Sequence, residues 1–218
     1  MYIAVRKNII PYFSVIVTTY NRADLLHRAF NSLLNQVEHD WECIIIDDGS
    51  NDDTFSICRK YLDSDPRFRY IFHSNRGQAL SKNVGILTAS GIYITFLDSD
   101  DEYRKDHLEI RHKVFNQNPH VELLHGGVKI IGNHYVPDLN DTTKMIHLSD
   151  CIIGGTFFIR KEKAIALGGF KALTYGDDTE FYERAVKKGF VIAKISYPTY
   201  FYNRDSPDSI CNNIKKSK

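Results

Sequence analysis

The sequence predicts an α/β fold, in which a mixed and mostly parallel central sheet is flanked by helices. Short apolar runs rich in β-branched residues recur along the chain, and a polar loop follows each of them. Segments with helical spacing of apolar residues lie between these runs. The 218 residues suffice for one α/β domain with a substantial core. The net charge of +1 provides no strong field for nucleic acid, so we expect no nucleic-acid partner.

The first expected strand is Phe13–Thr19, and it ends in the polar residues Tyr20, Asn21 and Arg22. The segment that follows has its apolar residues on one face of a helix. These residues are Leu25, Leu26, Ala29, Phe30, Leu33 and Leu34.

Two further strands are expected at Trp41–Ile46 and Tyr70–Phe72. The first runs into Asp47 and Asp48, and the Gly49 that follows permits a sharp turn. Because the carboxyl ends of parallel strands meet at one rim, and open α/β sheets bind ligands there, these loops are candidate binding loops.

A fourth strand, Tyr93–Leu97, leads directly into an acidic cluster that contains Asp98, Asp100 and Asp101. Carboxylates this close repel one another, and a divalent cation relieves the repulsion. The alternative is a solvated acidic turn, which is common after strands. We expect Asp101 to be either an additional ligand or a helix cap.

A second acidic pair, Asp177 and Asp178, opens a segment with amphipathic helical spacing that Gly189 ends. Acidic residues at a helix start are often caps that the helix macrodipole favours, which is the alternative to a catalytic role. Between the two clusters, residues 133–148 are expected to be irregular.

The remaining features concern the cellular setting. The four cysteines are scattered and form no Cys-x-x-Cys pair, which suits a reducing cytoplasm, and Cys43 is expected to be a small buried hydrophobe. No apolar run is long enough to span a bilayer. We expect residues 1–205 to form a single domain and residues 206–218 to form a polar, basic and flexible tail.

Six motifs along the chain, from Phe13 to Tyr202, resemble family 2 glycosyltransferases with the GT-A fold. Each motif alone is weakly specific, but all six stand in the family's order. They are Thr18–Arg22, Asp47–Ser50, Asn75–Ile86, Asp98–Asp101, Gly154–Phe170 and Gly176–Glu180.

The resemblance implies a site for a nucleotide diphosphate sugar, with UDP as the expected nucleotide. It implies that Mn²⁺ or Mg²⁺ is bound by Asp100, and that Asp98 binds either the ribose or the same metal. Lys82 replaces the commoner Arg and so loses a bidentate contact, and a solvated lysine is the alternative there. The residues implied to bind the donor are Thr18, Tyr20, Arg22, Asp47, Asp48, Asn75, Lys82, Asn83, Asp98, Ser99 and Asp100.

The resemblance also implies an inverting reaction in which Asp178 removes the proton of an acceptor hydroxyl. Asp177 replaces the family's Glu at the preceding position. Many relatives carry a His near the end of the domain that joins the metal site, whereas the run around Arg204 has none. Asp205, a water molecule or a lid formed by this segment are the alternatives.

The expected partners are a nucleotide-sugar donor and a glycan or lipid-linked glycan acceptor in bacterial surface polysaccharide synthesis. The resemblance implies a cytoplasmic protein with at most peripheral contact at the inner face of the membrane. One alternative is a sugar nucleotidylyltransferase, which should carry a glycine-rich basic loop where this chain has Thr18–Arg22. Another is a non-catalytic module for nucleotide sugars or glycans, against which the presence of Asp100 and Asp178 argues.

Overall fold

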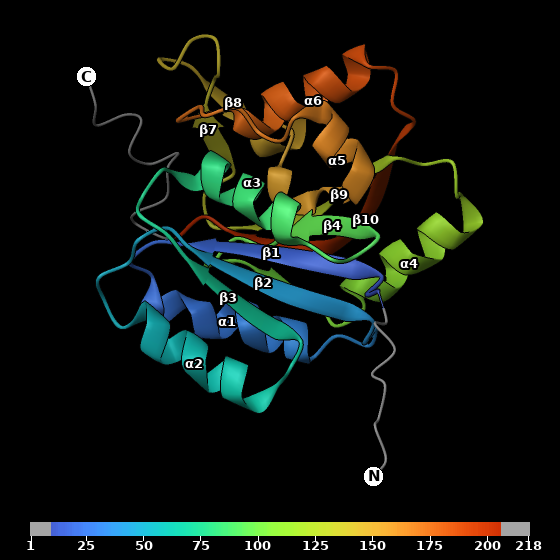
Figure 1. The fold of residues 1–218 in the computed structure, drawn as a ribbon. Helices are drawn as coiled ribbons and strands as arrows, with labels where there is room; N and C mark the ends of the chain where they lie inside the picture. Colours follow the sequence, from blue (N-terminus) through green and yellow to red (C-terminus); the bar gives the residue numbers. More distant parts are fainter. Residues whose placement is uncertain (1–9, 206–218) are drawn as a thin grey trace.

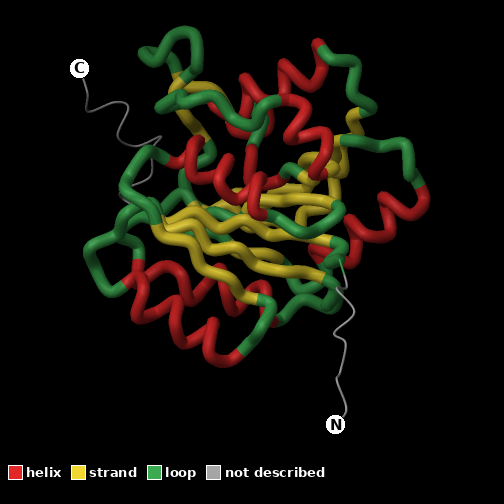
Figure 2. Tube along the Cα trace, in the orientation of Figure 1, coloured by secondary structure: helices red, strands yellow, loops and turns green. Residues whose placement is uncertain are grey.

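A computed structural model describes residues 10–205, so the tail expected at 206–218 lies outside the described residues. Helices cover both faces of one central sheet, which confirms the predicted α/β fold (Figures 1 and 2). In chain order the elements are β1 (Phe13–Thr19), α1 (Ala23–Leu34), β2 (Trp41–Asp47), α2 (Thr54–Ser64), β3 (Phe68–Phe72), α3 (Gln78–Thr88), β4 (Tyr93–Phe96), β5 (Glu102–Tyr103), α4 (His107–Gln117), β6 (Leu123–Ile131), β7 (Tyr135–Pro137), β8 (Met145–His147), η1 (Leu148–Asp150), η2 (Gly154–Thr156), β9 (Phe158–Arg160), α5 (Lys161–Leu167), α6 (Asp177–Lys187) and β10 (Ile192–Asn203).

The main sheet has eight strands in the order β3-β2-β1-β4-β9-β6-β10-β5. Strands β1 to β4 pair in parallel, and β9 pairs antiparallel with both β4 and β6. The sheet is therefore mixed, and its first half has the parallel arrangement that the sequence predicts.

Two buried clusters hold the layers together, one on each face of the sheet. Leu26, Phe30 and Leu33 of α1 pack on one face, where α2 and α4 also lie. On the other face, α3, α5 and α6 contribute residues such as Ile86 and Phe181, as Figure 1 shows above the sheet. Parallel strands covered on both faces are apolar throughout, which explains the continuous apolar runs of β1 and β2.

The parallel strands end in register, and this alignment builds the rim. Thr19 at the end of β1 pairs with Asp47 of β2, and Asp47 pairs with Phe72 of β3. The loops after these strands therefore leave the sheet side by side, as expected.

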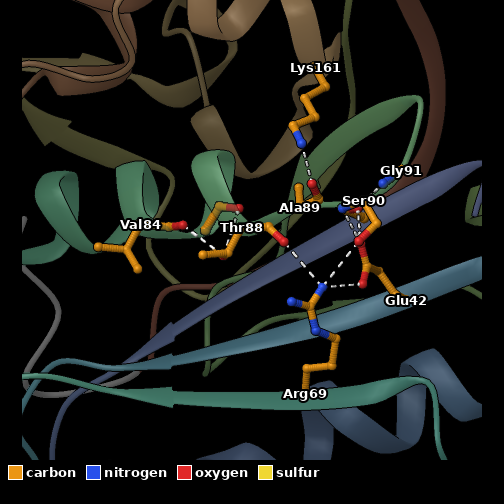
Figure 3. A network of polar contacts seen from close by, with 10 residues as sticks. Glu42, Arg69, Val84, Thr88, Ala89, Ser90, Gly91 and Lys161 are labelled. Atoms are coloured by element: carbon orange, nitrogen blue, oxygen red, sulfur yellow. Dashed lines mark hydrogen bonds and ion pairs between the residues drawn. The ribbon is translucent and has the colours of Figure 1, made fainter. Parts of the chain in front are cut away.

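At the opposite end of the sheet, Glu42 of β2 is buried and fastens the end of α3 to the strands (Figure 3). Its carboxylate accepts hydrogen bonds from Ser14 Oγ at 2.6 Å, Arg69 Nη1 at 2.7 Å and the Ser90 amide at 2.5 Å. Arg69 Nη1 also donates to the Thr88 carbonyl at 3.1 Å. Burial raises the pKa of Glu42, but these hydrogen bonds outweigh burial, so the pKa is lowered overall.

The prediction that residues 133–148 are irregular is wrong in part, because β7 and β8 pair as a hairpin. Each strand has only three residues, which is too short for a period of two to be read from the sequence. The hairpin is held to the loop before α6, where the Tyr175 hydroxyl donates to the Pro137 carbonyl at 2.6 Å.

Candidate functional site

The loop after β4 carries the first acidic cluster. Arg22 Nη1, from the loop before α1, lies 3.3 Å from Asp100 Oδ2 and donates to Ser99 Oγ at 3.2 Å. Arg28 of α1 donates to the Asp100 carbonyl at 3.1 Å. The structure thus brings together three residues that the sequence assigns to the donor. It also places the Arg22 guanidinium next to the buried carboxylate of Asp100.

Asp98 is the half-buried first carboxylate of this cluster. Gln78 Nε2, at the start of α3, donates to Asp98 Oδ1 at 3.1 Å. Burial raises the pKa of Asp98, and the charge of Asp100 adds to the rise, whereas Lys82 and Arg22 oppose it. Added positive charge next to Asp98 would therefore favour its ionised form.

The oxygens of this cluster fit a hard divalent cation. Asp98 Oδ2 and Asp100 Oδ1 take no hydrogen bond from residues 10–205, which leaves two carboxylate oxygens available. Within the same range, no group of three or more His, Cys, Asp or Glu residues is placed to hold a metal. Mg²⁺ is usually held by one or two carboxylates together with substrate phosphates and water, and two oxygens meet that need.

Asp101 is neither a helix cap nor an open ligand. The next helix, α4, begins at His107, and both Asp101 oxygens accept hydrogen bonds from β10. The Tyr200 hydroxyl donates to Oδ2 at 2.5 Å, and the Asn203 amide donates to Oδ1 at 2.7 Å. Asp101 therefore ties the acidic loop to the last strand.

Asp47 and Asp48 hold the loops after β2 and β3 by hydrogen bonds. Asp47 accepts from the Ser50 amide at 2.8 Å and from the Tyr70 hydroxyl at 2.6 Å. Asp48 accepts from the backbone amides of residues 76 and 77, each at 2.8 Å, at the start of α3. Both carboxylates are buried, and their assignment to the donor stays a prediction.

The other residues expected to contact the nucleoside lie on the same rim. Thr18 pairs with Ile46 within the sheet, and Tyr20 follows β1 with 47% of its surface exposed. Asn75 is exposed in the loop between β3 and α3. Tyr20 is thus not a core aromatic, and its ring is free to cover a planar base.

The second acidic pair begins α6, as predicted. Asp178 Oδ2 accepts from the Gly154 amide at 3.0 Å, and Oδ1 accepts from the Thr179 amide at 2.7 Å. Burial and the charge of Asp177 raise the pKa of Asp178 to about 6, although Lys82 and the two amides oppose the rise. Such a carboxylate is ionised at neutral pH yet basic enough to accept a proton.

Lys82 connects the two acidic clusters. Its Nζ lies 3.1 Å from Asp177 Oδ2, and its charge interacts with both Asp98 and Asp178. Burial lowers the pKa of Lys82, but the three carboxylates outweigh burial and raise it overall. Lys82 is buried, so the solvated alternative for this residue is wrong.

Asn83 is fastened to the protein itself. Its Nδ2 donates to the Phe170 carbonyl at 2.8 Å, and its Oδ1 accepts from the Phe170 amide at 2.7 Å. These bonds fix α3 against the loop after α5, and the assignment of Asn83 to the nucleotide stays a prediction.

Sequence reasoning missed three contributors to this site: Gln78, the Gly154 amide and Tyr200. Gln78 stands inside a quoted motif and lies one helical turn before Lys82, which was an available signal. Tyr200 lies 99 residues after Asp101, and no local pattern marks such a pair. As for the missing His, Asp205 is exposed and lies against Gly132 rather than within a group of ligands.

Comparison with known proteins agrees with this arrangement. The profile of glycosyl transferase family 2 matches residues 14–171, which is most of the chain. The chain belongs to glycosyl transferase family 2. The first relatives are matched over only 17% to 46% of their own length, so this family 2 chain spans less than half of the curated relatives it matches.

The chain is similar to one curated protein in sequence and to two solved structures in fold. The GalNAc(5)-diNAcBac-PP-undecaprenol beta-1,3-glucosyltransferase of Campylobacter jejuni is 45% identical over 94 residues, which cover 42% of this chain and 30% of the relative. The structure of S. aureus TarS 1–349 in complex with UDP-GlcNAc matches with a TM-score of 0.77 at 23% identity, covering 91% of this chain and 60% of TarS. The mannosyltransferase PcManGT of Pyrobaculum calidifontis, in complex with GDP-Man and Mn²⁺, matches with a TM-score of 0.71 at 21% identity, covering 88% of this chain and 56% of PcManGT.

Both structural matches show that the family 2 chain has the GT-A fold. Among the residues that the structure describes, no helix is long and apolar enough to cross a membrane.

Proposed function

We propose that this chain is an inverting, metal-dependent glycosyltransferase that moves a sugar from a nucleotide diphosphate sugar to an acceptor hydroxyl. The observation that carries the proposal is the pairing of two acidic clusters through Lys82, one open to a cation and one that contains the half-buried Asp178 with its raised pKa. A nucleotidylyltransferase needs no such base for an acceptor hydroxyl.

Donor binding follows from the rim of the parallel strands. The backbone around Asp48 and the exposed ring of Tyr20 receive the nucleoside, and Asp98, Ser99 and Asp100 face its ribose and phosphates. Arg22 and Lys82 both place positive charge near Asp98, where negative charge develops on the leaving diphosphate. Mn²⁺ or Mg²⁺ held by Asp98 and Asp100 would supply further positive charge to that leaving group.

Asp178 then acts as general base. The acceptor oxygen forms a bond to the anomeric carbon of the donor as the bond to the diphosphate oxygen breaks, and the acceptor proton passes to Asp178. The Gly154 amide and the Thr179 amide each donate to one oxygen of this carboxylate. These two hydrogen bonds hold the Asp178 carboxylate in a fixed orientation. Attack opposite the diphosphate gives inversion, and positioning supplies much of the rate.

We infer that the donor carries UDP and that the acceptor is a glycan or lipid-linked glycan of the bacterial surface. Two similar proteins support this substrate class. TarS forms a complex with UDP-GlcNAc, and the Campylobacter relative is a glucosyltransferase named for a glycan linked to undecaprenol. PcManGT binds GDP-Man with Mn²⁺, so GDP donors belong in the test.

The test is release of nucleoside diphosphate from UDP-GlcNAc, UDP-glucose and GDP-mannose in the presence of MnCl₂, with and without a pool of bacterial glycolipid. Asp178→Asn should lower turnover by about 10² to 10⁴-fold while the dissociation constant for UDP changes little. In a parallel reaction with UTP or GTP and a sugar 1-phosphate, release of pyrophosphate would establish the nucleotidylyltransferase alternative. Nucleotide binding without any turnover in the wild type would establish the non-catalytic module.

A further inference from the structure

The hydroxyl of Tyr200 lies where the acidic loop meets the turn that holds the base. Tyr200 is on β10, fully buried, and its hydroxyl donates to Asp101 Oδ2 at 2.5 Å. The Asp98 amide points at the same hydroxyl from 3.4 Å, at the long limit of a hydrogen bond. Through Asp101 and Asp98, this one oxygen therefore contacts both ends of the Asp98–Asp101 loop.

The other side of the same hydroxyl faces the η2 turn. A methyl group on Gly155 would overlap the Tyr200 hydroxyl and the ring carbon that carries it, so glycine is required for this approach. The neighbouring Gly154 donates its amide to Asp178 Oδ2 at 3.0 Å, and a methyl group there would lie 2.9 Å from Asp178 Cβ. The η2 turn therefore contacts Tyr200 through Gly155 and the base through Gly154.

We propose that Tyr200 is a positioning residue, whose hydroxyl sets the spacing between the Asp98–Asp101 loop and Asp178. The inference rests on the proposed function, because the spacing matters only if one cluster holds the donor and the other activates the acceptor. A fully buried carboxylate that gives both oxygens to β10 does not bind donor or cation, so the role of Asp101 is to anchor the tyrosine.

The structure offers a matched control in Tyr103, the cross-strand partner of Tyr200. Tyr103 is also buried, and its ring centroid lies 5.7 Å from that of Tyr200. Its hydroxyl donates to the Phe96 carbonyl at 2.9 Å, within the sheet, and does not join the two clusters. Removing either hydroxyl leaves the ring in the same core, but Tyr200→Phe also takes a donor from the buried carboxylate of Asp101, so the structural cost of each variant is measured separately.

The experiment compares kcat and KM for UDP-GlcNAc, UDP-glucose and GDP-mannose, measured as nucleoside diphosphate release with MnCl₂, in the wild type, Tyr200→Phe and Tyr103→Phe. Since a displacement of about 1 Å can cost 10²-fold in rate, we expect kcat of Tyr200→Phe to fall by about 10 to 100-fold, while KM changes by less than about 3-fold. Tyr103→Phe should keep both parameters within about 3-fold of the wild type. Thermal unfolding of each variant gives the structural cost separately.

Two further variants keep the inference testable if Tyr200→Phe folds poorly. Gly155→Ala displaces the hydroxyl without removing it and should reproduce the loss of kcat. Asp101→Asn should lose kcat as well, and its combination with Tyr200→Phe should be no worse than the stronger single change, because residues of one unit are not additive.

An unchanged kcat in Tyr200→Phe, or an equal loss of kcat in Tyr103→Phe, would overturn the inference. If the wild type turns over a donor in the same experiment, the proposed function still stands. A wild type that turns over none of the three donors would overturn the proposed function, and this inference with it.

Discussion

Lys82 Nζ lies 3.1 Å from Asp177 Oδ2, and the two side chains are only 7% and 17% exposed. The pair joins α3 to the first turn of α6, where the proposed base Asp178 also sits. Lys82 opposes the rise in the pKa of Asp178 that burial and Asp177 cause. Lys82 and Asp177, two positions at which the sequence departs from the motifs it resembles, therefore contact each other directly.

Lys82→Met should therefore weaken both the fold and the base. Removing one partner of a buried pair leaves an uncompensated charge, and we expect a loss of about 3 kcal/mol in the free energy of unfolding. The pKa of Asp178 should rise, so the acid limb of kcat should move to higher pH. Urea unfolding and the pH dependence of donor turnover measure the two effects.

Lys171→Met is the control for Lys82→Met. Lys171, in the loop after α5, pairs with Glu180 of α6 at 2.6 Å, but the side chain of Lys171 is 60% exposed. Exposed pairs contribute little, so stability and the acid limb should both stay near the wild type. If the acid limb of Lys82→Met coincided with that of the wild type, Lys82 would not influence the base.

The pH dependence of kcat follows from Asp178. Its pKa is raised to about 6, first by burial and then by Asp177, and only the ionised form accepts a proton. At saturating donor, kcat should be flat above this pH and should fall about tenfold per pH unit below it. A steady-state profile from pH 4.5 to 8.5 measures the limb, and a profile that stays flat down to pH 5 would argue against Asp178 as the base.

Glu42 gives a prediction on stability rather than activity. Its pKa is lowered in the folded state, so its ionised form stabilises the fold above the unfolded pKa, and this contribution is lost as the pH falls through the folded pKa. Glu42→Gln should lower the free energy of unfolding by about 1 to 3 kcal/mol at pH 7, because hydrogen bonds to a charged group are replaced. The difference from the wild type should shrink below about pH 4.5.

Urea unfolding at several pH values measures this difference. Glu109→Gln is the matched control, since Glu109 pairs with Lys113 on the surface of α4 and its side chain is 35% exposed. An equal loss of stability in both variants would mean that the network in Figure 3 contributes no more than a surface pair.

Much of this molecule follows from local sequence patterns, and the parts that do not are contacts between distant segments. The strands β1 and β2 and the acidic loop after β4 are legible because burial on both faces makes each strand continuously apolar and each loop polar. The bond from Tyr200 to Asp101 joins residues far apart in the chain, so no spacing predicts it. The β7–β8 hairpin is a local contact, but it was not predicted because its strands are too short to show a period of two.

The last prediction concerns the cation. UDP at about 100 times its dissociation constant should stabilise the protein by roughly 2.7 kcal/mol, which for a chain of this size is about 5 to 10 °C in the unfolding midpoint. If the carboxylates of Asp98 and Asp100 hold the cation, the shift should require MnCl₂ or MgCl₂, and Asp100→Ala should abolish the metal-dependent part of it.

Asp106→Ala provides the control for Asp100→Ala, because Asp106 pairs with Arg104 at the start of α4, outside the acidic loop. Its own stability can change, but the shift that UDP and Mn²⁺ add to it should equal that of the wild type. A full shift with UDP in EDTA would show that the protein binds the nucleotide without a cation. A full metal-dependent shift in Asp100→Ala would show that the cation is bound elsewhere. Burial raises the pKa of Asp98, so protons compete with the cation for this carboxylate as the pH falls. The metal-dependent shift in the unfolding midpoint should therefore weaken at lower pH.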